Sequence, residues 1–113
     1  MRKMVVIGLA VAGLTSAVAP GVALAGDEDD ARVAIAAAKA KLDSAEKAGV
    51  GGNAGDVLNR SRTTLEQANA KFRDDEDRFA LALARQAEAL ADLATATAEA
   101  RALEAERSKI ASN

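Results

Sequence analysis

Apolar residues after position 30 recur at alternating intervals of three and four, the spacing that places side chains on one face of a helix. In the first such segment they are Ala31, Ile35, Ala38, Leu42 and Ala45. Charged residues occupy the other face, and an acidic run at residues 27–30 precedes the segment, where the helix macrodipole favours negative charge. The pattern predicts a helix over about residues 31–48 that ends at Gly49.

Four glycines among residues 49–55 interrupt this pattern. Because glycine loses more conformational freedom in a helix than any other residue, the segment predicts a loop. Asp56 is a typical N-cap residue, so we expect a second helix to begin there. The inward face of this second helix is predicted to consist of Leu58, Ser61, Leu65, Ala68 and Phe72.

The last segment of the chain has the most regular pattern. Six alanines repeat at intervals of four and three residues: Ala80, Ala84, Ala87, Ala91, Ala94 and Ala98. Small side chains let packed helices approach closely, so this seam is predicted to face the other helices, with Phe72 and Phe79 as packing anchors. The pattern continues to Ile110 and predicts a third helix over about residues 75–110. This helix is longer than the others, and we expect its end to project from the bundle.

The acidic segment 73–77 lies between the second and third helices and contains neither Gly nor Pro. Aspartate prefers caps to helix interiors, and an unbroken helix would place the Asp75 carboxylate on the apolar face, where burial without a partner is costly. A turn at 73–76 gives an all-α fold, a small antiparallel bundle of three helices with a long C-terminal helix. A continuous helix at 73–76 would instead give a two-helix hairpin.

Residues 1–25 have the organisation of a secretory signal peptide. A positively charged start is followed by an uncharged run, and Ala23-Leu24-Ala25 places small residues at positions −3 and −1 before Gly26. We therefore expect a signal peptide over 1–25 and a single Ala-rich helical domain over 26–113. The protein would be periplasmic or secreted after cleavage between Ala25 and Gly26. The alternative is an uncleaved membrane anchor.

The composition restricts the chemistry that the chain can perform. Without His or Cys there is no usual zinc, copper, haem or iron–sulfur ligand set, no thiol nucleophile and no imidazole base. Ser44, Ser61 and Ser108 have no histidine to activate them, and Lys39 with Asp43 has the spacing of a helix-surface ion pair. The acidic run before the first helix lacks the ligand order of a calcium-binding EF-hand loop. We expect no catalytic, cofactor-binding or metal-binding residues and no enzymatic activity.

Charge and the remaining residue types narrow the choice of partner. The chain has 15 Lys and Arg against 17 Asp and Glu, no basic run, and neither Trp nor Tyr to stack on bases, so nucleic acid is not an expected partner. Lipid binding needs large apolar residues flanked by basic ones, whereas these faces are mainly Ala with mixed charges.

The favoured interpretation is protein–protein interaction with an envelope protein, or self-association. The candidate contacts are Leu103 and Ile110, at the end of the third helix. The alternative is an amphipathic module that associates with lipid or the cell-wall surface. Contact with the membrane is otherwise expected only through the signal peptide before cleavage.

The segment from Ala45 to Ala102 resembles a family of exported bacterial proteins catalogued as domain of unknown function 4398. The resemblance rests on an Ala-rich first helix, on Leu58, Leu65 and Ala68 in the second, on an acidic turn at Asp74-Asp75, and on the run from Phe79 to Ala102. Many members are lipoproteins and some are fused to peptidoglycan-binding domains, so the resemblance implies a helical cell-envelope protein; it brings no known active site. This chain has Ala54-Gly55-Asp56 where the family usually has an aromatic-Ala-Pro step, and it has no Cys to carry a lipid.

Overall fold

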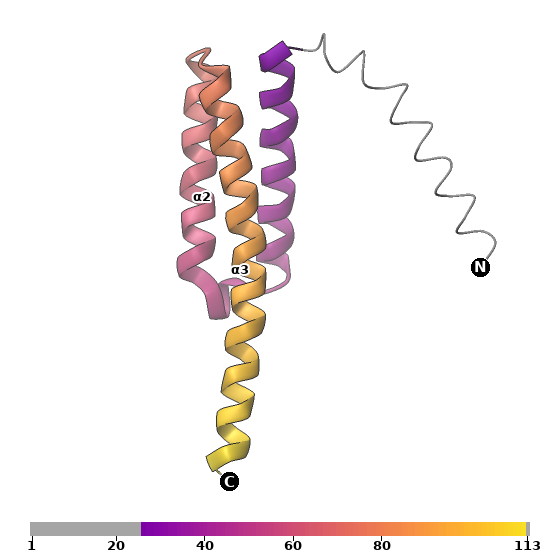
Figure 1. The fold of residues 1–113 in the computed structure, drawn as a ribbon, viewed down its shortest axis with the longest axis vertical. Coiled ribbons are helices and arrows are strands. Elements are labelled where there is room, and N and C mark those ends of the chain that lie inside the picture. Colours follow the sequence, from indigo (N-terminus) through magenta and orange to yellow (C-terminus); the bar gives the residue numbers. More distant parts are fainter. Residues whose placement is uncertain (1–25, 113) are drawn as a thin grey trace, which may run out of the picture.

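The computed structural model describes residues 26–112, which form a bundle of three helices, each antiparallel to the next along the chain (Figure 1). An N-terminal helix covers residues 26–47, α2 covers Gly51–Arg73, and α3 covers Asp77–Ser112. The described residues contain no strand. The predicted three-helix bundle with a long C-terminal helix is confirmed, and the two-helix hairpin is excluded because α2 and α3 are separate. The predicted signal peptide at 1–25 lies outside the described residues.

The turn after the N-terminal helix is a Schellman motif, in which two backbone bonds satisfy the last free carbonyls of a helix. The N–H of Val50 donates to the carbonyl of Ala45, and the N–H of Gly49 donates to the carbonyl of Glu46, both at 3.1 Å. Gly49 has φ of 80°, the left-handed conformation that glycine adopts without steric cost. Val50 is buried next to Ala45, so the turn also contributes a side chain to the core.

The turn between α2 and α3 is built in the same way, with an aspartate in place of the glycine. The N–H of Glu76 donates to the carbonyl of Lys71 at 2.9 Å, and the N–H of Asp75 donates to that of Phe72 at 3.1 Å. Asp75 has φ of 61°, a conformation that Asp tolerates better than most residues. The predicted turn at 73–76 is confirmed, and it leaves Asp75 exposed rather than in the apolar face.

The described residues are helical from residue 26 onward, ahead of the predicted start near residue 31. The acidic residues that were expected to precede it form its first turn instead. There Arg32 makes ion pairs with Glu28 at 3.0 Å and with Asp29 at 3.1 Å. These contacts, one helical turn apart, and the favourable position of negative charge at a helix N-terminus explain the longer helix.

The predicted loop at 49–55 is also shorter than expected. The N–H groups of Asn53 and Ala54 donate to the carbonyl of Val50, at 3.2 and 2.9 Å, and close a helical turn over the glycines. The break in the backbone lies at Ala54, which has φ of −134° and ψ of 39°. The continuous part of α2 therefore begins after Ala54, and Asp56 lies in its first turn rather than at the predicted N-cap.

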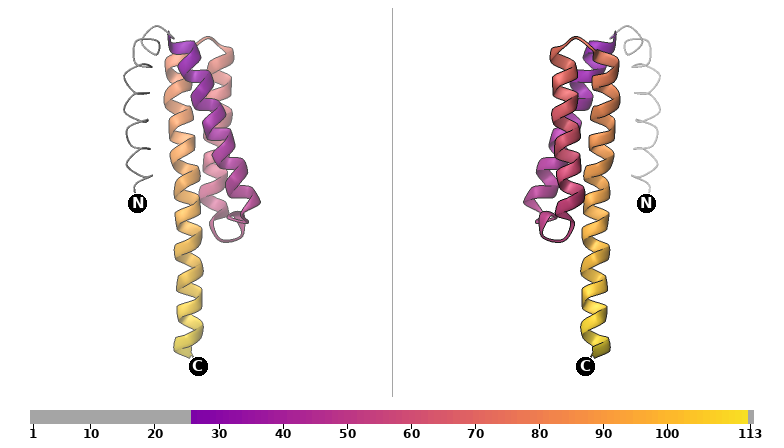
Figure 2. Two further views of the ribbon diagram at one scale, coloured as in Figure 1. Left: turned by 90° about the vertical axis from the view of Figure 1, so that its right-hand side faces the viewer. Right: turned by 90° about the vertical axis from the view of Figure 1, so that its left-hand side faces the viewer.

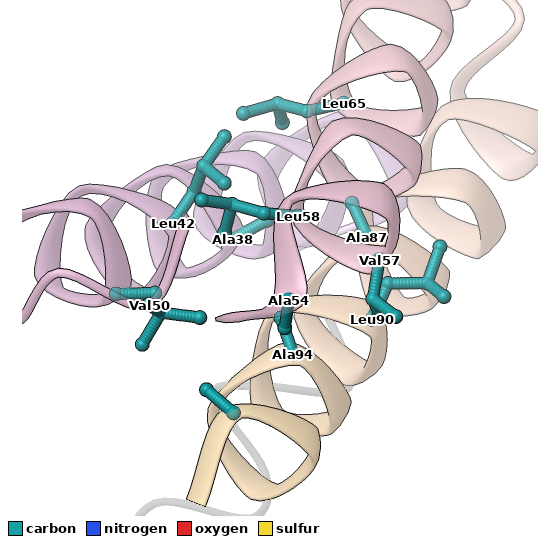
Figure 3. Packing of buried hydrophobic residues seen from close by; sticks show 12 residues of the cluster. Ala38, Leu42, Val50, Ala54, Val57, Leu58, Leu65, Ala87, Leu90 and Ala94 are labelled. Atoms are coloured by element: carbon teal, nitrogen blue, oxygen red, sulfur yellow. The ribbon is translucent and has the colours of Figure 1, made fainter. Parts of the chain in front are cut away.

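The core is built around the predicted alanine seam of α3, whose six members are all buried: Ala80, Ala84, Ala87, Ala91, Ala94 and Ala98. Leucines fill the spaces at its edges, and Figure 3 shows Leu42 of the N-terminal helix beside Leu58 of α2. The hydroxyl of Ser61 donates to the carbonyl of Ala87 at 2.7 Å in the buried interface of α2 and α3. A side chain as short as serine can reach the backbone of a neighbouring helix only if the two helices approach closely, and the small residues permit this.

The prediction that Phe79 anchors the packing is wrong, because 63% of this residue is exposed. Phe72 is half-buried, with the Arg32 guanidinium 5.6 Å from the centre of its ring. Adjacent helical residues differ by about 100° in direction, so Phe79 turns away from the core when Ala80 faces it. Six small residues with one spacing determine the orientation of α3, and a single aromatic residue does not override them.

Candidate interaction surface

Helix α3 extends beyond the other two helices, past the turn that joins the N-terminal helix to α2 (Figures 1 and 2). Ala98 is its last buried residue, and all residues from 99 to 112 are exposed. We call residues 102–112 the projecting segment. At a rise of 1.5 Å per residue, this segment is about 16 Å of exposed helix.

Arg101 marks the position at which α3 leaves the bundle. Its guanidinium donates to the carbonyl of Asn53 at 2.8 Å and to the two carboxylate oxygens of Asp56 at 3.0 and 3.4 Å. This hydrogen bond with Arg101, together with the backbone N–H of Val57, holds the pKa of Asp56 below its usual value. Arg101 follows Ala94 and Ala98 in the spacing of the seam. A charged residue bound to the start of α2 therefore ends the apolar seam.

Leu103 and Ile110 lie in the projecting segment, and each is 71% exposed. They are seven residues apart, which places them on one face of the helix. They do not continue the core seam, because the next seam positions after Arg101 are Ala105 and Ser108. The two candidate contact residues are thus accessible and share a face, while their role in binding stays a prediction.

The serine and lysine side chains considered for catalysis do not come together. Ser61 is 1% exposed and its hydroxyl is bound to a backbone carbonyl, whereas Ser44 and Ser108 are exposed on different helices. Lys39 lies 3.4 Å from Asp43 in an exposed ion pair. Within residues 26–112, no group of three or more acidic side chains could hold a metal ion. No helix in that range is long and apolar enough to cross a membrane.

A shallow groove between the N-terminal helix and α3 is a feature that sequence reasoning missed. It has a volume of about 460 Å³, and its lining includes Val33, Ala34 and Ala37 with the charged Arg85 and Glu88 at its edge. Val33 is 67% exposed. The sequence signals this groove only through Val33, which lies outside the predicted apolar face of its helix. A single exposed apolar residue is common on protein surfaces and does not by itself indicate a site.

Lys41 links the N-terminal helix to α3 through two ion pairs. Its ammonium lies 2.8 Å from the carboxylate of Asp92 and 3.5 Å from that of Glu88. The hydrogen bond to Asp92 is the main cause of the raised pKa of Lys41. These pairs are solvent-exposed, so they contribute more to the alignment of the two helices than to stability.

The opposite end of the bundle is acidic, where α3 starts close to the start of the N-terminal helix. Partial burial raises the pKa of Asp77, and the nearby carboxylates of Glu28, Asp75 and Asp27 raise it further. Lys71 reduces this charge locally through an ion pair with Glu76 at 3.0 Å. The two ends of the bundle therefore differ. The end with the turn at 73–76 is acidic, and α3 projects from the other end.

Comparison with protein-family models, with curated proteins and with solved structures finds no match to this chain. The resemblance noted over residues 45–102 therefore stays a prediction, and the surface has to be interpreted from its own residues.

Proposed function

We propose that this protein is a non-enzymatic, exported protein of the cell envelope that acts by binding another protein, or a second copy of itself, through α3. The observation that carries the proposal is the projecting segment, which presents Leu103 and Ile110 on one face beyond the last contact with the bundle. Short helices without tertiary contacts are marginally stable in water. A partner that covers this face would stabilise the segment and remove two large apolar side chains from solvent.

Export is supported by the pattern of residues 1–25 and is tested by the intact mass of the protein isolated from its native host. A mass that corresponds to a chain starting at Gly26 is expected. A mass that includes residues 1–25 would mean that the protein is held by a membrane anchor, and the exported form of the proposal would be wrong.

The binding proposal is tested by affinity capture from the native envelope with a double variant, Leu103→Ser/Ile110→Ser. The bound protein should be reduced at least about tenfold, since two apolar side chains are removed from the contact. The matched control is Ala102→Ser/Ala105→Ser, which changes two other positions of the same segment. Circular dichroism of both variants checks that the helices remain.

Unchanged capture by the variant Leu103→Ser/Ile110→Ser would contradict the proposal. Turnover of an envelope substrate that is lost on a single Ser or Lys change would contradict its non-enzymatic part.

Association with lipid is distinguished by the same two variants. The projecting segment carries Glu104 and Glu106 as well as Arg107 and Lys109, and this mixed charge does not favour an anionic membrane surface. We expect no sedimentation of the protein with vesicles of anionic phospholipid. If the protein binds such vesicles and the variant Leu103→Ser/Ile110→Ser does not, the partner of the projecting segment is lipid and not protein.

A further inference from the structure

The large apolar side chains that α3 exposes all belong to one line along the helix. They are Phe79, Leu93, Leu103 and Ile110, with exposed fractions of 63%, 48%, 71% and 71%. Starting at Phe79 and advancing alternately by three and four residues reaches each of the other three. The six positions between them are four alanines, Gln86 and Arg107, and all ten positions are exposed. We call this line, from Phe79 to Ile110, the outer stripe. Its spacing is that of the a and d positions of a coiled coil.

The outer stripe is distinct from the core seam. Phe79 and Leu93 each come one residue before a seam alanine, which rotates them by about 100° toward solvent. The seam ends at Arg101, whereas the stripe continues through Leu103 to Ile110. α3 therefore carries two apolar lines. One is covered by the bundle, and the other runs the full length of the helix without a covering element among the described residues.

Charged residues follow the outer stripe in a fixed order. Every seventh residue, immediately before the first position of each repeat, is charged: Arg78, Arg85, Asp92, Glu99 and Glu106. All five are exposed. The two basic residues come first along α3 and the three acidic residues follow them. A second α3 running in the opposite direction presents the reverse order and is complementary to the first.

The charges also favour one register. When Phe79 lies opposite the partner's Leu103, Arg78 faces the partner's Glu106 and Arg85 faces the partner's Glu99, and two-fold symmetry repeats both pairs. Asp92 then lies near its own copy at the centre. Lys41, which is 2.8 Å from Asp92 in each copy, offsets that repulsion. A parallel pair lacks these contacts and places Glu99 near the partner's Glu104, so it is disfavoured.

We propose that two copies of this chain pair in antiparallel orientation through the outer stripes of α3, with Phe79 packed against the partner's Leu103. This pairing rests on the proposed function and names its partner as a second copy. In this register Leu103 of each copy lies against the start of α3 in the other, whereas Ile110 extends past Asp77, the first residue of the partner's α3. The pairing therefore covers Phe79 and Leu103, two of the large apolar side chains that a single chain leaves exposed.

Sedimentation equilibrium of the exported protein should show a monomer–dimer equilibrium. Reversing two charges with Arg78→Glu/Arg85→Glu should weaken the dimer at least about tenfold, and adding Glu99→Arg/Glu106→Arg should restore it. The matched control is Arg60→Glu/Arg73→Glu, which makes the same change of net charge at exposed positions of α2 and should leave the dimer unchanged. A monomer at all concentrations up to about 1 mM, or a fourfold variant that is as weak as the double one, would overturn the pairing.

Orientation is tested by disulfide formation, since the chain has no cysteine of its own. In the proposed register, Gln86 lies opposite the partner's Ala96. A mixture of the single variants Gln86→Cys and Ala96→Cys should form a cross-linked heterodimer under mild oxidation, and neither variant should cross-link efficiently alone. Efficient cross-linking of Ala96→Cys with itself would indicate a parallel pair and overturn the proposal.

The two proposals can fail separately. A protein that is monomeric in sedimentation, but loses its captured partner with Leu103→Ser/Ile110→Ser, would disprove the pairing and leave the proposed function in place. A monomer whose capture is unaffected by that variant would disprove both.

Discussion

The two parts of α3 have similar compositions and opposite environments. In the bundled part, residues 77–98, the seam alanines and Leu90 are buried, whereas Phe79, Leu93 and the alanines of the outer stripe are exposed. In the projecting segment, residues 102–112, alanines and leucine alike are exposed. Ala91 is 1% exposed, whereas the more apolar Leu103 is 71% exposed. Burial in this protein therefore depends on whether a position faces another helix at close range, and not on the hydrophobicity of its residue.

This difference determines how the bundle is held together. An alanine contributes little apolar area, so the seam stabilises the fold mainly by allowing backbones and short side chains to approach. High helix propensity of Ala adds to this in both parts of α3. Only the bundled part combines both contributions, and the following variants measure the difference.

The largest effect is expected from overpacking the seam. Ala91→Phe inserts a ring where the helices are closest and should lower the free energy of unfolding by about 1 to 3 kcal/mol. Ala105→Phe occupies the same seam spacing, four turns later, and should cost only the difference in helix propensity, about 0.5 kcal/mol. Urea unfolding of both variants measures the comparison. Equal losses would show that seam packing does not distinguish the two parts.

A smaller loss of stability is expected when the buried Ser61 is replaced. Ser61→Ala removes the hydrogen bond to the carbonyl of Ala87, which is 2.7 Å long and fully buried, and should cost about 1 kcal/mol. Ser108→Ala in the projecting segment should be neutral or stabilise by a few tenths of a kcal/mol, because alanine is the better helix former. Thermal unfolding monitored by circular dichroism compares the two. A stabilising Ser61→Ala would indicate that the hydroxyl is not needed at the interface.

Removing the projecting segment should change the stability of the monomer very little. A chain that ends at Ala102 keeps the Arg101 contacts and loses no buried residue, so its free energy of unfolding should fall by less than about 0.5 kcal/mol. The experiment uses dilute protein, at which the monomer dominates. In the full chain, amides of 102–112 should exchange with solvent much faster than those of 80–98. A loss of more than about 1 kcal/mol would mean that the segment contacts the bundle.

The smallest effect is expected for the pKa of Asp56, which Arg101 binds at the boundary between the two parts of α3. The pKa of Asp56 is lower in the folded protein than in the unfolded chain, so the contribution of its carboxylate is present above the unfolded pKa and is lost as the pH falls through the folded pKa. An NMR titration should therefore show Asp56 ionising below the usual value for aspartate, about 3.9. Arg101→Gln should move that pKa upward, toward the usual value. An unchanged pKa in this variant would show that the contact with Arg101 is not the cause.

Local repetition explains which features of the fold could be predicted from the sequence. The faces of all three helices, including the seam from Ala80 to Ala98, follow from spacings that recur over several turns. The structure buries these positions except Ile35 and Phe72, which are half-buried. The turn at 73–76 follows from clustered aspartates, and the exposure of Leu103 and Ile110 follows from the length of the last helix. Each of these depends on residues that are close in the chain.

Only the tertiary structure decided the features that depend on how the three helices meet. Phe79 faces solvent because the alanines of α3 dictate its orientation in the bundle. The glycines before Ala54 form a helical turn, with the Asn53 carbonyl bound by Arg101, about fifty residues away in the chain. That same contact sets where α3 leaves the bundle. Helical periodicity is local information repeated many times, whereas a single contact between distant residues exists only after the helices have been placed.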